Sequence, residues 1–586
     1  MIPRKVYFFA FLLSLSFLIV ILKLASLQII AKDKILKYVE NQYYTKEKVA
    51  LPRGTIYDRK GKIFAISVPT ITVYVLPQYI KDLKDKNGKV IKTSFERKKE
   101  LAQRLSPVLK KSQTWILNKL KENQYVVLAR NLDKTLKPVI EDIRNETKIW
   151  NLGIVESSKR YYPMNKLAAN NIGFVRKTTG VGEEGLELKL NPVLGGGMGK
   201  VLFLKDALNN PITVVKEEKK ETKDVVLTID ANIQQMAEEA LKKLVKLRKP
   251  KEAVVLILNP NTGEILANAV YPTYNPNYYW KYRWFGNPTF RGMYEVGSLA
   301  KPFVMAKAIA TGKVKESELI WGGKGVVYVD GVRIRDHRPF KWITPRDIII
   351  HSSNVGIIKV ALRFKPDEFY NIFTRLGFGK STHTFPGESR GRLRLDPRPV
   401  QIAYAAIGQS WTATPIQVAV AYSAIANGGY LIKPHFVKEI ISKNGEKEVL
   451  QYKKGEKVLS DKEVNWLKDV LKLVVEKGTA HKGKSKYYTI AGKTGTAQKY
   501  DPKIRALSNK KFYTWFAGFF PVDKPKYTIV VFANEPKKIK KWEVIGGGSV
   551  SSTVLKELVD RLMFYSRTKP DKTVDKGEKN RHTNSR

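Results

Sequence analysis

Ser298-Leu299-Ala300-Lys301-Pro302 and the apolar run that continues to Thr311 decide how the second half of the chain folds. An apolar run of this length predicts a core helix, and a proline fits its first turn because N–H groups there have no helical partner. Ser298 and Lys301 are three residues apart, so on a helix they share a face and the ammonium group can reach the hydroxyl. Ser298 is then expected at a helix N-terminus, where its backbone N–H would stabilise an oxyanion.

Lys301 can assist Ser298 only in one protonation state. A serine hydroxyl becomes a strong nucleophile when a base takes its proton, and a lysine is such a base only when it is uncharged. We therefore expect the pKa of Lys301 to be lowered, either by burial or by a second cation such as Lys493.

Two further motifs follow in order. Ser352-Ser353-Asn354 lies between apolar runs and predicts a loop or a helix start. Lys493-Thr494-Gly495-Thr496 follows a β-rich run and predicts an active-site strand, on which Gly495 leaves room for a substrate backbone. An isolated S-x-x-K or S-x-N more often marks a helix cap, but the set S-x-x-K, S-x-N and K-T-G occurs in penicillin-binding proteins and class A β-lactamases. The three motifs together predict a serine acyl-transfer site.

Other catalytic chemistries are poorly supported by the sequence. The chain has six histidines, no H-E-x-x-H pair and no cysteine, so we expect neither a metal site nor a disulfide framework. We expect no cofactor.

Length and charge limit the possible partners. A chain of 586 residues predicts two or three domains. The net charge of +51 is extreme, but the basic residues are scattered and no nucleic-acid motif is present, so we expect no nucleic acid partner. An anionic membrane surface or an envelope polymer explains the charge equally well.

The N-terminus predicts a membrane anchor. Residues 6–22 are uncharged and nearly all apolar, and apolar residues continue to Ile30, which suffices because about 20 residues cross a bilayer. Arg4 and Lys5 favour a cytoplasmic N-terminus. The alternative is a cleaved signal peptide, but no A-x-A cleavage site follows. We expect a single-pass protein of the inner or plasma membrane with its catalytic domain on the extracytoplasmic (periplasmic) side.

The order of elements predicts an α+β, multidomain chain. Hairpins are expected on both sides of a helical stretch, which indicates an antiparallel sheet with an inserted helical lobe. The expected elements are strands 253–258 and 264–271, strands 512–520 and 527–533, a helix 94–105 closed by Pro107, and a final helix 550–565. The expected segments are a cytoplasmic stub and transmembrane anchor (1–30), a helical connector to about residue 50 with a mixed α/β domain (31–222), the catalytic domain (223–565) and a disordered polar tail (566–586).

Over nearly its whole length the chain resembles class B penicillin-binding proteins. The family pattern R-G-x-I-x-D-R-x-G stands here as residues 53–61, and Arg160-Tyr161-Tyr162-Pro163 and residues 182–187 are similar to two more motifs of the non-catalytic pedestal, or dimerisation-type, domain. Residues 352–356 and 386–391 resemble the septal, FtsI-type members. One departure is Glu295-Val296-Gly297-Ser298-Leu299-Ala300, where the family commonly has Glu-Pro-Gly-Ser-Thr-Phe. The resemblance implies a penicillin-binding/β-lactamase-like transpeptidase domain on a pedestal.

The resemblance implies a peptidoglycan D,D-transpeptidase that cross-links stem peptides and is inhibited covalently by β-lactams. Ser298 would attack the penultimate D-Ala carbonyl with Lys301 as the base, and an amine of a neighbouring peptide would resolve the acyl-enzyme. The remaining implied roles are proton relay to the leaving group (Ser352, with Lys493 nearby), peptide-amide binding (Asn354), substrate binding along the strand (Thr494, Gly495 and Thr496, with both threonines on the carboxylate), and an oxyanion hole of backbone N–H groups (Ser298 and Thr496).

The sequence leaves several alternatives for the function and the partners open. The resemblance implies a membrane-embedded SEDS-type glycan polymerase and other division or elongation proteins as partners, since the chain has no polymerase of its own. An elongation-type class B transpeptidase and a non-enzymatic β-lactam sensor or division scaffold remain alternatives. A β-lactamase would need a base for water, for which Glu388 is the only acid at a suggestive distance after Asn354. A bifunctional class A enzyme is disfavoured because no histidine precedes His337.

Overall fold

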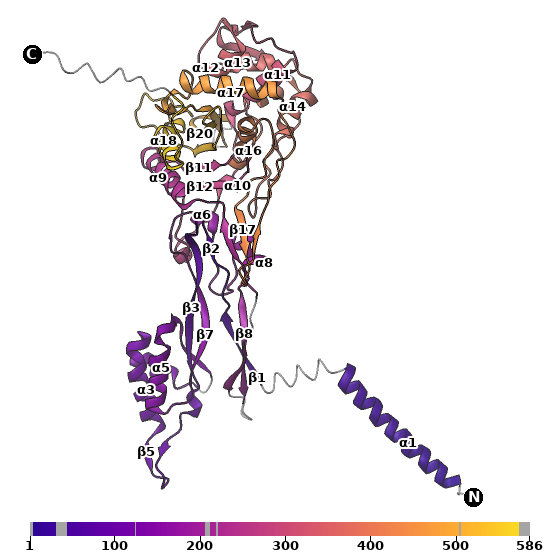
Figure 1. The fold of residues 1–586 in the computed structure, drawn as a ribbon, viewed down its shortest axis with the longest axis vertical. Coiled ribbons are helices and arrows are strands. Elements are labelled where there is room, and N and C mark those ends of the chain that lie inside the picture. The colour runs from indigo at the N-terminus through magenta and orange to yellow at the C-terminus, as the bar shows by residue number, and fades with distance from the viewer. Residues whose placement is uncertain are drawn as a thin grey trace, which may run out of the picture.

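A computed structural model describes residues 4–30, 44–122, 125–205, 211–217, 221–502 and 506–572. The catalytic domain lies at one end of an elongated molecule, and long strands form a stalk below it. A small distal lobe lies at the far end of the stalk (Figure 1). Helix α1 (Arg4–Ala25) continues as a π-helical turn (Ser26–Ile30). Residues 5–29 of this segment are long and apolar enough to cross a membrane, with a mean hydropathy of 2.5.

The catalytic domain is built on a five-stranded antiparallel sheet with strand order β12-β11-β21-β20-β19. Both predicted hairpins are confirmed. The strands are β11 (Glu252–Leu258), β12 (Ile265–Tyr271), β19 (Ala491–Asp501), β20 (Ala506–Phe520) and β21 (Tyr527–Asn534). Because β19 is an end strand, its outer edge pairs with no other strand of the described chain, and a substrate backbone can approach it.

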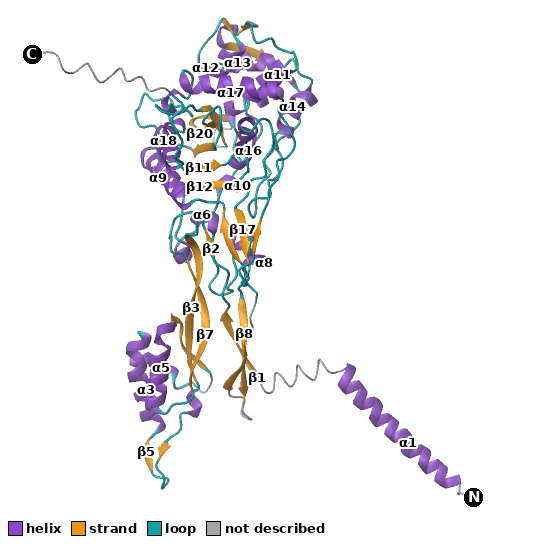
Figure 2. Cartoon of the chain, viewed as in Figure 1, coloured by secondary structure: helices purple, strands orange, loops and turns teal. Residues whose placement is uncertain are grey.

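Helices cover both faces of this sheet. Helix α9 (Ala231–Arg248) contacts β11 and β12 and is joined by α18 (Leu555–Tyr565), whereas α16 (Pro415–Ala426) contacts β11, β20 and β21 from the other side (Figure 2). All twelve residues of α16 are buried, which explains its apolar composition. Helix α17 (Asp461–Glu476) packs between β19 and the helical lobe.

The helical lobe is inserted between β12 and β19, as predicted. Its helices are α10 (Pro288–Arg291), α11 (Lys301–Ala310), α12 (Pro345–His351), α13 (Asn354–Ala361), α14 (Pro366–Arg375) and α15 (Pro399–Ala406). Four short strands form two hairpin-like pairs beside them: β13 (Ile320–Trp321) with β16 (Trp342–Ile343), and β14 (Val326–Val329) with β15 (Val332–Arg335).

The stalk contains two sheets. The larger has the order β18-β17-β10-β2-β3-β6 with β7 also on β3, and its longest member, β3, pairs with β7 over ten residues. Its strands are β2 (Ile56–Tyr57), β3 (Ile63–Val75), β6 (Val126–Asp133), β7 (Leu152–Tyr161), β10 (Asp224–Leu227), β17 (Val437–Ile441) and β18 (Lys447–Val449). The smaller sheet contains β1 (Tyr44–Ala50), β8 (Met198–Lys205) and β9 (Pro211–Glu217).

The distal lobe packs three helices on β6 and β3. They are α3 (Ser94–Leu109), α4 (Gln113–Lys119) and α5 (Lys137–Thr147), with a small hairpin of β4 (Leu83–Lys84) and β5 (Val90–Lys92) beyond them. Short helices α6 (Ala169–Ile172), α7 (Gly185–Lys189) and α8 (Asn191–Leu194) lie where the stalk meets the catalytic domain.

Two sequence-based expectations about these elements were wrong. Pro107 does not close the helix at residue 105, because in the last turn a proline removes only one hydrogen bond; α3 ends instead at Leu109, where Lys110 adopts a left-handed conformation. The part of the expected helical connector that is described, Tyr44–Ala50, is a strand because it pairs antiparallel with β8. Residues 31–43 of that connector lie outside the described residues.

The expected disordered tail is ordered over its first residues. Residues 566–572 lie against the catalytic domain, where Asp571 accepts a hydrogen bond from the backbone N–H of Thr489 at 2.8 Å and Lys572 donates to the backbone oxygen of Ser485 at 3.0 Å. These contacts fix a polar segment that composition alone marked as disordered. Residues 573–586 lie outside the described residues.

Candidate active site

Ser298 lies in a tight turn that leads into the predicted helix. The turn is a 3₁₀ segment, Gly297–Leu299, and α11 begins at Lys301. Gly297 has a φ of +57°, and a Cβ atom there would lie 2.6 Å from the backbone oxygen of Thr496. A Cβ atom on Gly495 would lie 2.6 Å from the oxygen of Val296. Glycine at both positions therefore lets the nucleophile turn lie directly against β19.

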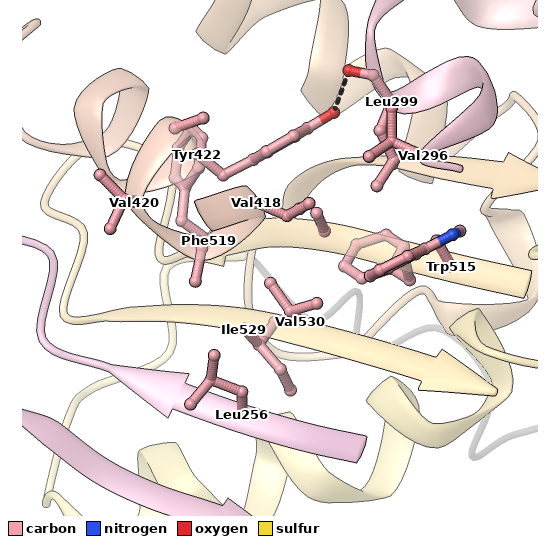
Figure 3. Packing of buried hydrophobic residues seen from close by; sticks show 14 of the residues in the cluster. Leu256, Val296, Leu299, Val418, Val420, Tyr422, Trp515, Phe519, Ile529 and Val530 are labelled. Atoms are coloured by element: carbon pink, nitrogen blue, oxygen red, sulfur yellow. Dashed lines mark hydrogen bonds between the residues drawn. The ribbon is translucent and has the colours of Figure 1, made fainter. Parts of the chain in front are cut away.

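Buried side chains hold this turn from behind. Tyr422, on α16, donates a hydrogen bond from its hydroxyl to the backbone oxygen of Leu299 at 3.1 Å (Figure 3). Trp515, on β20, donates from its indole N–H to the backbone oxygen of Glu295 at 3.0 Å. Val296 and Leu299, which depart from the family pattern, are buried in the same apolar cluster. Ser298 itself is half-buried, so the turn is rigid while its hydroxyl stays accessible.

Lys301 is fully buried and binds the second motif. Its Nζ donates to the backbone oxygen of Ser352 at 2.6 Å, to Oδ1 of Asn354 at 2.7 Å and to Oγ of Ser352 at 3.3 Å. No hydrogen bond among the described residues joins Lys301 to the Ser298 hydroxyl. Burial lowers the pKa of Lys301 to about 7, against an opposing effect of the nearby Asp336 carboxylate. At neutral pH a large fraction of Lys301 is thus uncharged, as the sequence predicted.

Ser352 and Asn354 lie at the junction of two helices. Ser352 is the left-handed residue that ends α12, with a φ of +63°, and Ser353 caps α13 by accepting from the N–H of Gly356 at 3.0 Å. Asn354 is the first residue of α13, and its side-chain amide donates to the backbone oxygen of Arg335 at 2.8 Å. The prediction of a loop or helix start is confirmed.

Lys493 is the second buried lysine of the site. It lies on β19, is fully buried, and donates from Nζ to the backbone oxygen of Thr494 at 3.1 Å. Burial lowers the pKa of Lys493 well below its ordinary value, and repulsion by Lys301 lowers it further. Repulsion of this kind disfavours a proton on both lysines at once. Burial, rather than the partner lysine, is the larger cause of the lowered pKa in each case.

The rest of the third motif follows the alternation of a strand. Thr494 and Thr496 are two residues apart on β19 and so lie on the same face. The Thr494 hydroxyl is 2.7 Å from the hydroxyl of Thr479, and the Thr496 hydroxyl accepts from the N–H of Gly547 at 3.0 Å. The structure therefore brings all three motifs together, with Ser298 beside the strand that carries these threonines.

Comparisons with known proteins agree with this geometry. Residues 253–560 match the penicillin binding protein transpeptidase domain, and residues 48–227 match the penicillin-binding protein dimerisation domain. The chain is 30% identical over 546 residues to a probable peptidoglycan D,D-transpeptidase, PenA, of Neisseria meningitidis serogroup A, covering 91% of this chain and 88% of the relative. It belongs to the penicillin-binding proteins.

Further relatives place the chain within class B. It is 28% identical over 582 residues to the peptidoglycan D,D-transpeptidase FtsI of Escherichia coli K12, covering 97% of this chain and 92% of the relative. The crystal structure of penicillin binding protein 2X from Streptococcus thermophilus has the same fold, with a TM-score of 0.76 and 23% identity over 90% of this chain and 81% of that one. This class B penicillin-binding protein is a peptidoglycan D,D-transpeptidase.

One carboxylate of the penicillin-binding site was missed by the sequence reasoning. Asp336 follows β15 and accepts hydrogen bonds from the Ser353 hydroxyl at 2.7 Å, from the N–H of Asn354 and from the N–H of Val355 at 3.1 Å. It thereby anchors the start of α13 and raises the pKa of Lys301. The residue is 18 positions before Asn354, so only the fold brings it there.

The pedestal motifs of this penicillin-binding protein meet in a buried ion cluster. Glu187 binds Arg53 at 3.0 Å through one carboxylate oxygen and Arg160 at 2.7 Å through the other. The side chains of Arg53, Arg160 and Glu187 are exposed by 2%, 5% and 0%, so the pairing takes place away from solvent. The three motifs quoted for the pedestal thus form one structural joint, as predicted for non-catalytic residues.

Proposed function

We propose that this transpeptidase works through a covalent acyl-enzyme on Ser298, with Lys301 as the base. The single observation that carries the proposal is the fully buried Lys301, whose pKa of about 7 leaves it able to accept a proton, three residues after an accessible serine. The neutral amine of Lys301 takes the Ser298 proton while the oxygen attacks the penultimate D-Ala carbonyl. The Ser298 ester forms, the peptide bond breaks, and terminal D-Ala leaves.

The other site residues have distinct roles in this proposal. Ser352 lies 3.3 Å from Lys301 and so provides a path for the proton from Lys301 to the leaving amine. Backbone N–H groups of Ser298 and Thr496 stabilise the oxyanion, each worth roughly 3 kcal/mol. Thr494 and Thr496 bind the terminal carboxylate beside Lys493, Asn354 holds the peptide amide, and Gly495 lets the substrate backbone pair with the edge of β19. A substrate carboxylate would also raise the pKa of Lys493 and restore its charge.

Penicillin provides the direct test. Mass spectrometry of peptides from the penicillin-treated protein should locate the adduct on Ser298. Ser298→Ala should abolish it, whereas Ser442→Ala, a control in the turn between β17 and β18 of the stalk sheet, should label normally. An adduct that survives Ser298→Ala contradicts the proposal.

We also propose that the penicilloyl-enzyme is long-lived, which separates the protein from a β-lactamase. Hydrolysis needs a carboxylate placed for water, and Glu388, the candidate base, is occupied by its own loop: it accepts from the N–H groups of Thr382 at 2.6 Å and Thr384 at 2.8 Å. The adduct should persist for minutes or longer after free penicillin is removed. Release within seconds, abolished by Glu388→Gln, would favour the β-lactamase reading.

We propose a septal role in cell division. The support is the similarity to relatives called FtsI and the asparagine at position 354 in an S-S-N motif. A fluorescent fusion in the native cell should gather at the division site, and selective inhibition should block division and give elongated cells. Localisation along the side wall with rounded cells would show an elongation enzyme instead. Binding of penicillin with no cross-linking of peptidoglycan in vitro would show a sensor or scaffold.

We propose that α1 anchors the protein with its catalytic domain outside the cytoplasm, where a membrane-embedded SEDS-type polymerase supplies the glycan strands. The support is the exposed apolar α1, whose first two residues, Arg4 and Lys5, are basic, and the lack of a polymerase domain among the matched regions. Co-purification of the polymerase with this protein from detergent should depend on α1 and the pedestal. Full capture of the polymerase by a variant without both would place the interface elsewhere.

A further inference from the structure

A cavity of about 490 Å³ lies where the pedestal meets the transpeptidase domain. Its walls come from the end of β7 (residues 159–162), the loop 175–180 and the 3₁₀ turn Pro276–Lys281. No residue of the three catalytic motifs lines it. Its volume is within the range of sites that bind small molecules, roughly 300–1,000 Å³.

The cavity carries positive charge that the described part of the chain does not neutralise. Lys159 and Lys177 both line it, and neither forms an ion pair with a described carboxylate. Burial and repulsion by Lys159 lower the pKa of Lys177, so the two ammonium groups are close enough to repel each other. An anion in the cavity would pair with both ammonium groups.

Aromatic rings form the other part of the wall. Tyr161, Tyr278 and Trp280 are 43%, 49% and 51% exposed, which is high for such large apolar side chains. The Nζ atom of Lys177 lies 3.5 Å from the centre of the Trp280 ring, so a cation and a ring face are presented side by side. Flat ring faces suit the apolar C–H faces of sugar rings.

We propose that this cavity binds an anionic glycan, specifically a disaccharide unit of peptidoglycan whose stem peptide contributes a carboxylate. The sugar rings lie on Trp280 and Tyr278, and the carboxylate lies between Lys159 and Lys177. The site is separate from Ser298, so it holds a glycan strand while another part of the polymer reacts. Because the walls belong to both domains, an occupied cavity also ties the pedestal to the transpeptidase domain.

The test uses the full chain in nanodiscs of neutral lipid, with Ser298 first acylated by penicillin so that the catalytic cleft is closed. Calorimetric titration with a purified disaccharide-tetrapeptide should show saturable binding. Lys177→Glu and Trp280→Ala should each weaken it at least tenfold. Lys242→Glu is the matched control, because it makes the same charge change at an exposed position of α9 that does not line the cavity, and it should bind within twofold of the native protein.

Three results would overturn the proposal. They are the absence of binding to the acylated protein, an equal loss in Lys242→Glu, and equally tight binding of polyglutamate, which has carboxylates without sugar rings. The mass of the same acylated sample reports whether penicillin reached Ser298. A failure of the cavity proposal is thereby distinguished from a failure of the catalytic one.

Discussion

Two regions of the molecule bury charged or chargeable side chains, in opposite arrangements. One is the structural joint of the pedestal, and the other is the active site. In the joint, Glu187 lies between Arg53 and Arg160 and binds both within 3.0 Å. In the active site, Lys301 and Lys493 are both fully buried, and neither forms an ion pair with a described carboxylate. A buried charge with its partners is fixed, whereas a buried amine without a counter-ion gives up its proton easily.

The difference shows which buried charges of this chain are reactive. The two fully buried lysines with lowered pKa values both belong to the catalytic motifs, in agreement with the general clustering of perturbed groups at functional sites. The joint contains residues from three sequence motifs as well, so motif membership alone does not separate the two regions. Four measurements test the contrast.

The largest effect is expected when Lys301 is replaced by methionine. Lys301→Met removes the base, and because general bases contribute about 10²–10⁴-fold, we predict that acylation by a fluorescent penicillin slows by about 10³-fold. The control is Lys307→Met on the same helix, whose side chain is 34% exposed and which should react within twofold of the native rate. A loss of less than tenfold in Lys301→Met would show that another group takes the proton.

The second effect is on stability. Glu187→Gln leaves two buried guanidinium groups without their charge partner, and we predict that the free energy of unfolding falls by about 3–5 kcal/mol. Glu183→Gln, at the exposed Arg176–Glu183 pair, should change it by less than about 1 kcal/mol. Denaturant titration measures both. A loss in acylation rate per folded Glu187→Gln molecule would contradict a purely structural role for the joint.

The third effect is a pH dependence of stability. The pKa of Lys301 falls from 10.5 to about 7 on folding, so between these values the unfolded chain binds more protons than the folded one. The free energy of unfolding must therefore rise with pH in this window, by up to about 1.4 kcal/mol per pH unit from this group. Between pH 7.5 and 9.5 the rise should be smaller in Lys301→Met. Equal slopes would show that Lys301 is charged in the folded protein.

The smallest effect is a shift of the acylation profile along the pH axis. The rate should rise through about pH 7 as Lys301 loses its proton. Asp336→Asn removes an anion that favours the charged form, so the rising limb should move to lower pH by up to ~1 unit. Burial and Asp336 account for the pKa of Lys301 without a contribution from Lys493, so Lys493→Ala should leave the limb in place. A limb that stays in place in Asp336→Asn would mean that the carboxylate does not influence the pKa of Lys301, and a limb that moves in Lys493→Ala would mean that Lys493 does.

Local sequence signals predicted much of this fold and site. The hairpins 253–271 and 512–533 were placed by turn residues between β-rich runs, and the three motifs were recognised by their order. Asp336 was missed because nothing near it in the sequence resembles a motif; it matters only because β15 ends beside α13. The strand Tyr44–Ala50 was missed because its polar composition suggests a helix, and its partner β8 is about 150 residues away.

The cavity could not be predicted for a similar reason. Its charged wall comes from residues 159–177 and its aromatic wall from residues 276–280, about 100 positions later. Charge and aromatic content are visible in the sequence, but the absence of a counter-ion is a property of the packed structure. Contacts between residues that are far apart in the sequence cannot be predicted from local patterns in a single sequence.

The sheet that joins the two halves of the molecule also has a mechanical consequence. Strand β2 of the pedestal pairs in parallel with β10, which in turn pairs with β17. The two domains are therefore joined by backbone hydrogen bonds within one sheet. A pull along the stalk loads those bonds in shear, where neighbouring bonds resist together. Tension on the stalk is therefore transmitted to the domain that carries Ser298 through paired strands, without a slack linker between the two domains.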